Sequence, residues 1–290
     1  MIDPHLLLSG VIFGLSMGSV FFLMTLGLSL CFGLMRVISM DQLLYYAVGA
    51  YLTYTVSMAI GNVWLGILVG VLVSALVGFV IERLVFQRTY SREITFSMII
   101  SFGLLIGGIG IIKAVWGLVP RPVPVPIEAQ WNILGTEVPV YRIVVVLIAV
   151  LVYAGIWAFL NKTIIGKAIR AGIEDVGHTE GLGINVSRLF TLTFILAGAL
   201  SGLAGGLHAP LIMVFPDMGL EILAFAFMVV IIGGLGSIKG TFISAFLVGQ
   251  VVSIGSLVYA PLAQMAPFAI MLLILLIKPT GLYGSAMLKR

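Results

Sequence analysis

The sequence has few charged side chains, and this scarcity decides the class of the protein. Asp, Glu, Lys and Arg make up 9% of its 290 residues, and hydrophobic residues make up 61%. A soluble globular domain carries about 25% charged residues. The mean hydropathy is +1.24. So few charges cannot cover a surface that faces water, which excludes a soluble domain and predicts a protein that lies in a lipid bilayer.

Residue types used in metal binding and catalysis are also scarce. Cys31 is the one cysteine, which excludes a disulfide within the chain and predicts a buried thiol. The three histidines have no metal-ligand spacing, and no serine–histidine–aspartate arrangement predicts catalysis. A phosphate-binding loop is missing, because Asn161 stands where that motif would need a glycine before Gly166-Lys167. We therefore expect a non-catalytic chain that binds no metal and no ATP itself.

Apolar runs follow one another along the whole chain. Runs of about 20 apolar residues are typical of membrane-spanning helices. We therefore predict an all-α, polytopic membrane protein that forms one domain over residues 1–290, with eight or nine transmembrane helices and nine preferred. The nine segments are Leu6–Leu34, Leu43–Ile60, Val63–Phe86, Ile94–Leu118, Tyr141–Leu160, Leu189–Leu207, Ile222–Ile232, Phe242–Tyr259 and Pro267–Ile277.

Lys and Arg gather on one side of this arrangement. If nine segments alternate from an outside N-terminus, Lys113, Arg121 and Arg142 fall outside and the other twelve of the fifteen basic residues fall inside. This bias follows the positive-inside rule and predicts a cytoplasmic C-terminus. The basic residues are dispersed along the inner face, so nucleic-acid binding is not expected.

Residues 161–188 form the longest polar interruption, and the predicted topology makes them a cytoplasmic loop. Within it, Lys167–Leu182 has the pattern of a short amphipathic helix, which Gly181 and Gly183 would end. A charged, helix-forming segment between two apolar halves indicates a place where a partner docks.

Residues 119–140 are predicted to form an extracytoplasmic, Pro-rich loop. Alternating prolines favour extended, non-helical chain. The loop would be either a docking surface for an extracytoplasmic partner or a stiff linker on the helix ends, and we favour the linker.

A few polar residues allow two interpretations. Asp41 would be a functional residue if it lay within the membrane, but we favour a surface ion pair with Arg36. Glu82 is predicted to be a solvated charge at a helix end. The short segment Ile222–Ile232 would span, re-enter or break, and the turn 233–240 after it would be either a tight loop or a broken helix end that faces a substrate.

The cytoplasmic loop contains a spaced set of residues: Gly166, Ala168, Arg170, Ala171, Asp175, Gly183, Ile184 and Asn185. Further motifs occur at Ala197–Gly205, Gly233–Gly240 and Lys278–Gly284. Together these motifs resemble those of branched-chain amino acid permeases of ABC importers, the LivH type. Two places depart from the family's pattern: Thr179, where an alanine is usual, and Ser39–Leu43 near the start.

The resemblance implies a permease subunit of an ABC importer in the cytoplasmic (inner) membrane of a bacterium or archaeon. Its implied partners are a second homologous permease, two cytoplasmic ABC ATPases that hold ATP and Mg, and an extracytoplasmic substrate-binding protein. The implied ATPase-coupling residues are Gly166, Arg170, Ala171, Asp175, Gly183 and Ile184. The predicted transport-pathway residues are Ser39, Asp41, Gln42, Tyr45, Gly233, Gly234, Gly236 and Ser237.

The cargo expected from the resemblance is a branched-chain or other small hydrophobic amino acid, moved by alternating access. Urea, short amides and small organic acids are alternatives. A self-sufficient channel or secondary transporter is a different class, which the scarcity of membrane charges disfavours. A membrane-embedded enzyme ranks last, because no titratable residues converge in the sequence.

Overall fold

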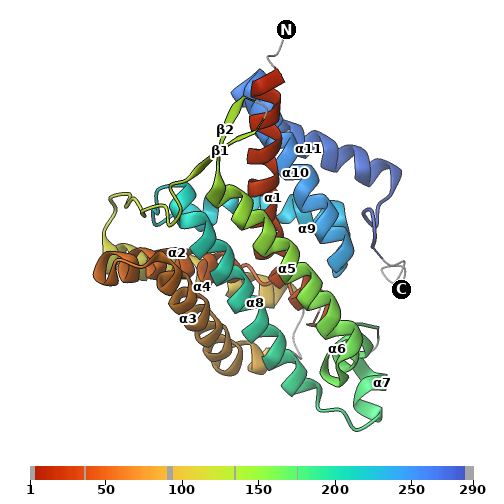
Figure 1. The fold of residues 1–290 in the computed structure, drawn as a ribbon. Helices are drawn as coiled ribbons and strands as arrows, with labels where there is room; N and C mark the ends of the chain where they lie inside the picture. The colour runs from red at the N-terminus through yellow and green to blue at the C-terminus, as the bar shows by residue number, and fades with distance from the viewer. Residues whose placement is uncertain (1–3, 36, 90–93, 134, 175, 285–290) are drawn as a thin grey trace.

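The computed structural model describes residues 4–35, 37–89, 94–133, 135–174 and 176–284, and Figure 1 shows their fold. Two short helices, α6 (Ile164–Glu174) and α7 (Val176–Gly181), lie together at one end of this described part. Nine longer helices build the body: α1 (Pro4–Met35), α2 (Gln42–Ile60), α3 (Val63–Leu84), α4 (Ile94–Trp116), α5 (Val140–Lys162), α8 (Val186–His208), α9 (Met218–Gly233), α10 (Ile238–Val258) and α11 (Ala260–Ile277). Short 3-10 turns follow α3 at Phe86–Arg88 and α8 at Ala209–Leu211.

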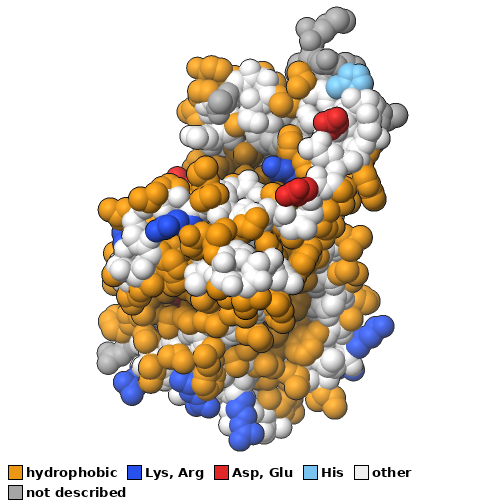
Figure 2. All heavy atoms as spheres, turned by 60° about the vertical axis from the view of Figure 1, so that its left-hand side comes forward, with side chains coloured by type: hydrophobic (Ala, Val, Ile, Leu, Met, Phe, Trp, Pro, Cys, Tyr) orange, Lys and Arg blue, Asp and Glu red, His pale blue; other side chains and the backbone are white. Residues whose placement is uncertain are grey.

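The predicted all-α, polytopic membrane fold is confirmed. Within the described residues, seven helices are long and apolar enough to cross a membrane, namely α1 to α5, α8 and α10. Each of the nine predicted apolar segments coincides with a helix. Large apolar side chains remain exposed, among them Leu72, Ile99, Leu151 and Leu276. Hydrophobic side chains cover much of the surface that Figure 2 shows. Side chains of this kind suit contact with lipid tails.

Helix α9 is one continuous helix, although its glycine-rich C-terminal end allowed a break. It has 16 residues. At 1.5 Å per residue it is about 24 Å long, shorter than the hydrocarbon core of about 30 Å. The helix stops at Gly233, where Gly234 adopts a positive φ of 95°. It is therefore shorter than a typical membrane-spanning helix.

Small residues allow the central helices to pack at backbone distance. Helix α1 packs along α10 and α8, and α8 also packs on α2 and α3. A Cβ added to Gly205 of α8 would lie 1.9 Å from the Tyr46 carbonyl oxygen, and one added to Gly49 would lie 2.2 Å from that of Gly202. In lipid, burial of apolar surface contributes little driving force to helix association, so such close backbone contact is a main source of it.

Charge separates the two ends of the bundle. We call them the α6–α7 end and the β1–β2 end. Of the described basic residues, Lys113, Arg121 and Arg142 belong to the β1–β2 end. The α6–α7 end carries the others: Arg83, Arg88, Lys162, Lys167, Arg170, Arg188, Lys239 and Lys278. Basic side chains line the lower edge of the molecule in Figure 2.

The β1–β2 end contains a small sheet that the all-α prediction did not include. Strands β1 (Gln130–Ile133) and β2 (Thr136–Pro139) pair antiparallel, with Trp131 opposite Val138. The Pro-rich chain before them is extended, as predicted. Backbone bonds of 2.8 Å in both directions join Arg121 to Val214, so this chain lies against the segment that follows α8. The hairpin is too short and too local for apolar periodicity to reveal it.

The packing of α8 predicts a sharp contrast between two glycine substitutions. Gly205→Ala should lower the thermal midpoint of the detergent-solubilised protein, because overpacking costs about 1–3 kcal/mol. Gly107→Ala in α4 meets no atom within 4 Å, so it should leave the midpoint unchanged or raise it slightly. Fluorescence-detected size-exclusion chromatography after heating measures both. Equal midpoints for the two variants would contradict this account of the packing.

Candidate functional site

A buried polar network joins the end of α1 to the start of α2. The Asp41 carboxylate accepts hydrogen bonds from the hydroxyls of Ser39 and Tyr45. Beside it, the Gln42 side-chain oxygen accepts a 2.9 Å bond from the Ser201 hydroxyl. All four predicted pathway residues of this region, Ser39, Asp41, Gln42 and Tyr45, are fully buried. The structure brings them together, and their role in a pathway stays a prediction.

The expected surface position of Asp41 is wrong, since its side chain has no exposed area. The chain turns at residue 41 inside the bundle, where the Asp41 carbonyl accepts the Leu44 and Tyr45 backbone N–H groups. Arg36, the expected ion-pair partner, lies outside the described residues. Burial raises the pKa of the Asp41 carboxyl to about 6, although the hydrogen bonds from Ser39 and Tyr45 lower it. The carboxyl is thus held by hydroxyl donors within the protein.

Glu82 is also buried and not solvated as expected. Its carboxylate accepts a 2.9 Å hydrogen bond from the Thr191 hydroxyl of α8. The last turn of α3 stays inside the bundle because Gly78 lets α3 approach α8, where a Cβ on Gly78 would lie 2.8 Å from the Phe194 carbonyl oxygen. A charge in the last turn of an apolar segment therefore need not mark its solvated end.

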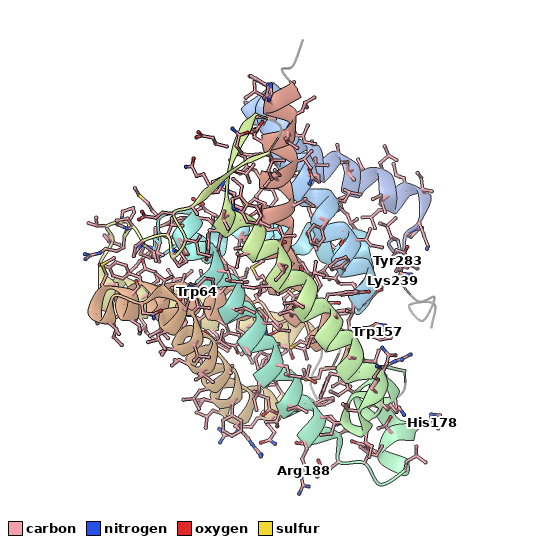
Figure 3. The ribbon with its side chains drawn as sticks, viewed as in Figure 1. Trp64, Trp157, His178, Arg188, Lys239 and Tyr283 are labelled. Atoms are coloured by element: carbon pink, nitrogen blue, oxygen red, sulfur yellow. The ribbon has the colours of Figure 1, made fainter. Side chains whose placement is uncertain are left out.

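The turn after α9 and the C-terminal segment form one structural unit at the α6–α7 end. The Ile232 and Gly233 carbonyls accept the backbone N–H groups of Leu282 and Tyr283 at 2.8 and 3.0 Å. Lys239 lies over the Tyr283 ring, 5.1 Å from its centre (Figure 3). The predicted pathway residues Gly233, Gly234, Gly236 and Ser237 belong to this turn. This geometry favours the tight loop over a broken helix end at a substrate, and a pathway role for these residues stays a prediction.

Helix α6 begins earlier than the predicted Lys167, because the Thr163 hydroxyl accepts the Gly166 N–H at 3.0 Å, as a cap does. Gly166 is needed at the α5–α6 corner, where a Cβ would lie 2.1 Å from the Phe159 carbonyl oxygen. The Arg170 side chain, directed outward, donates to the Asn161 side-chain oxygen.

The other predicted coupling residues lie on or just after α6 and α7. Ala171 and Ile184 are partly buried, Gly183 is exposed with a φ of 79°, and Asp175 lies outside the described residues. Exposed apolar side chains accompany them, with Ile164 87% and Leu182 77% exposed. His178 and Arg188 mark this end in Figure 3.

Helix α6 rests directly on the end of α1. A Cβ on Gly172 would lie 2.6 Å from the Leu34 side chain, and one on Gly33 would lie 3.6 Å from the Ile173 side chain. Ile169 of α6 is also buried. A force on α6 would therefore reach α1 through direct contact.

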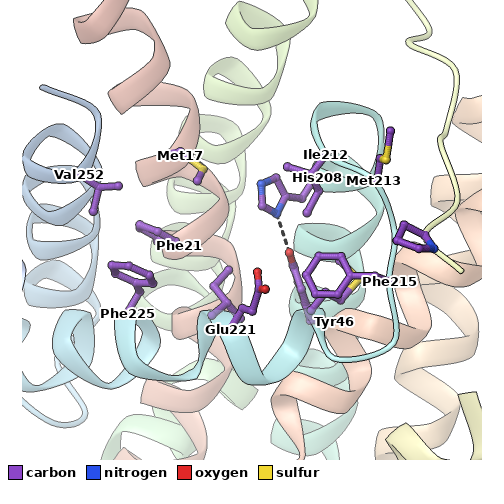
Figure 4. Close-up of a pocket in the computed structure, with 13 residues that line it drawn as sticks. Met17, Phe21, Tyr46, His208, Ile212, Met213, Phe215, Glu221, Phe225 and Val252 are labelled. Atoms are coloured by element: carbon purple, nitrogen blue, oxygen red, sulfur yellow. Dashed lines mark hydrogen bonds between the residues drawn. The ribbon is translucent and has the colours of Figure 1, made fainter. Parts of the chain in front are cut away.

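A cavity of about 330 Å³ lies between α1, α8 and α9 (Figure 4). Its wall is mainly apolar, and its polar members are Tyr46, His208 and Glu221. None of these three residues was among the predicted site residues. The one signal in the sequence for this site was that His208 and Glu221 are ionisable residues next to the ends of predicted apolar segments.

Comparison with known proteins agrees with this architecture. A model of the family described as "Branched-chain amino acid transport system / permease component" matches residues 10–276. The high-affinity branched-chain amino acid transport system permease proteins LivH of Salmonella typhimurium and BraD of Pseudomonas aeruginosa are each 25% identical to the chain. Both cover 93% of the chain, and the chain covers 93% and 94% of them respectively.

A third relative comes from Methanocaldococcus jannaschii. Its probable branched-chain amino acid transport permease protein LivH is 28% identical over 90% of the chain and 88% of the relative. No solved structure matches the chain.

The helices and the cavity between them define a multi-pass membrane protein of the transport permease class. More particularly, the chain belongs to the family of branched-chain amino acid transport system permease components.

The buried carboxyl of Asp41 predicts a pH dependence of stability. Folding raises its pKa from 3.8 to about 6, so the folded protein holds this proton more tightly than the unfolded chain does. Its contribution to the free energy of unfolding is therefore full below about pH 4 and falls by up to about 3 kcal/mol as pH rises through 6.

Asp41→Asn removes this titration and keeps the shape of the side chain. The thermal midpoint of the wild type, relative to that of Asp41→Asn, should fall between pH 4 and pH 7. Parallel midpoint curves for the two proteins would refute a raised pKa at this site.

Proposed function

We propose that the chain is the membrane-spanning permease subunit of an ABC importer that moves a small hydrophobic amino acid. The observation that carries the proposal is the family match over residues 10–276, which spans the whole helical body. The relatives named above are branched-chain amino acid transport permeases, which supports a branched-chain amino acid as the cargo.

The α6–α7 end is proposed to be cytoplasmic. Eight of the eleven described basic residues belong to this end, and the positive-inside rule assigns such an end to the cytoplasm. The hairpin and the N-terminal end of α1 would then lie on the extracytoplasmic side, where a substrate-binding protein would deliver cargo.

Two cytoplasmic ABC ATPases, which would hold ATP and Mg, are proposed to dock on α6 and α7. Exposed Ile164 and Leu182 beside the exposed cations Lys167 and Arg170 offer the mixed apolar and charged surface that a protein partner recognises. A second, homologous permease would complete the membrane part of the importer. In this proposal the chain itself is not catalytic.

Coupling is proposed to be mechanical, with alternating access as its result. Movement of the ATPases would displace α6, and the contacts of Gly172 with Leu34 and of Ile173 with Gly33 would transmit this displacement to α1. Helix α1 lines the cavity with Met17 and Phe21, so its movement would change the cavity. Sub-ångström shifts at one site can be amplified in this way because packed helices have discrete arrangements.

The importer proposal predicts that α6–α7 variants lose their partner and keep their fold. Leu182→Asp should abolish co-purification of ATPase subunits and ATP-dependent leucine uptake, because a charge would replace an apolar contact. The thermal midpoint should not change, because Leu182 is 77% exposed. Affinity purification in mild detergent, followed by identification of the bound subunits, measures the association.

Val119→Asp is the matched control, because it places the same charge at a 67% exposed residue of the β1–β2 end. It should retain the ATPases. Normal uptake by Leu182→Asp would argue against coupling through this end. Leucine transport by the chain alone in liposomes without ATP would replace the importer proposal with a channel or secondary transporter.

A further inference from the structure

The cavity between α1, α8 and α9 has the size and the wall of a site for a small ligand. Ligand pockets run from about 300 to 1,000 Å³, so its 330 Å³ is at the small end. The Phe21 and Phe225 rings stack with their centres 5.4 Å apart on one side of it. Met213 and Pro120, from loops of the β1–β2 end, also line the cavity. It is therefore next to the end at which the importer proposal expects cargo to arrive.

His208 lines this cavity with a buried side chain. It is 4% exposed, and its Nε2 is buried without a hydrogen-bond partner among the described residues. Its Nδ1 is 2.5 Å from the Tyr46 hydroxyl oxygen, so Nε2 is the ring nitrogen left for a ligand, which would reach it after a small shift of the side chains around it (Figure 4). We assign the tautomer in which the Tyr46 O–H donates to Nδ1, because a phenol is the more acidic donor. Nε2 then carries a hydrogen that suits a carboxylate oxygen.

A carboxylate faces the same cavity from the first turn of α9. Glu221 lines the cavity, and Figure 4 shows its carboxylate on the same side as the His208 ring. The neighbouring acid, Asp217, is paired with Lys113 at 2.8 Å, whereas Glu221 has no salt bridge in the described part of the chain. An acid in a first helical turn also complements the helix dipole, but that role needs no cavity.

We propose that this cavity is a binding site for a small amino acid with an apolar side chain. Its ammonium group would bind the Glu221 carboxylate, its carboxylate would accept the hydrogen of His208 Nε2, and its side chain would contact Phe21 and Phe225. The three groups match the three parts of a zwitterionic, aliphatic ligand. The proposal deepens the importer function and rests on it for the cargo class only.

The test uses the full chain in nanodiscs, without a binding protein, and radiolabelled L-leucine as the probe. The wild type should bind L-leucine saturably. It should bind two analogues at least about tenfold more weakly: isocaproate, which lacks the ammonium group, and isoamylamine, which lacks the carboxylate. Glu221→Gln should weaken L-leucine binding about tenfold or more and remove the preference over isocaproate.

Asp217→Asn is the matched control, since it removes one carboxylate four residues before Glu221 that does not line the cavity. It should bind as the wild type does. Tyr46→Phe keeps the ring beside His208 but removes the hydroxyl that donates to Nδ1. The imidazole hydrogen is then no longer held on Nε2, where it would bind the ligand carboxylate. The preference for L-leucine over isoamylamine should therefore decrease. Glu221→Gln and Tyr46→Phe are compared only where the thermal midpoint matches that of the wild type.

Two outcomes would overturn the proposal: no saturable L-leucine binding by the wild type, or unchanged affinity and selectivity in Glu221→Gln. Co-purification of ATPases separates this result from the fate of the importer proposal. If the ATPases bind and uptake requires ATP while Glu221→Gln transports normally, the importer stands and the binding site fails. If no ATPase co-purifies but the variants bind L-leucine more weakly as expected, the binding-site proposal is supported and the importer proposal is refuted.

Discussion

The structure depends on backbone-to-backbone contact between helices that carry glycine where they cross. Lipid tails are as apolar as leucine, so burying leucine between helices brings little gain, and dispersion at short range must replace it. Helix α8 provides this contact for α2 and α3, with Gly198 close to the Ser74 carbonyl and Gly205 close to the Tyr46 carbonyl. Because the helices are so close there, the polar groups on those turns are held inside the protein and removed from lipid.

This close packing explains why buried polar groups sit where they do. A buried polar group without a partner costs about 1–3 kcal/mol, so Asp41, Gln42 and Glu82 need fixed donors. Ser39 provides a hydroxyl donor from the same turn, and Ser201 and Thr191 provide hydroxyl donors from α8. The described buried side-chain atoms without a hydrogen bond are few, and His208 Nε2 is one of them, in a side chain that lines the cavity. The proposed ligand site thus differs from the networks around Asp41 and Glu82, whose polar groups are partnered within the protein.

Apolar run length and basic-residue asymmetry predicted the nine helices and the two ends of the bundle, because both are properties of single segments in a bilayer. The burial of Asp41 and Glu82 was not predicted, since it depends on helix crossings that bring distant segments together. The hairpin at Gln130–Pro139 was missed because four-residue strands carry too little periodicity. The cavity was missed for the same reason as the buried carboxylates: Tyr46, His208 and Glu221 come from three helices, and no spacing in the sequence relates them.

Helix α1 connects the two candidate sites. Its last turn contacts α6 through Leu34, and its middle lines the cavity through Met17 and Phe21. Between these points it packs along α10 and α8, and Gly18 and Gly249 meet there at backbone distance, which resists independent bending of one segment. We therefore expect a displacement of its end at Leu34 to shift or rotate the helix as a unit. Such a stiff element, in contact with the proposed docking surface at one end and with the proposed ligand cavity along its length, would couple the two.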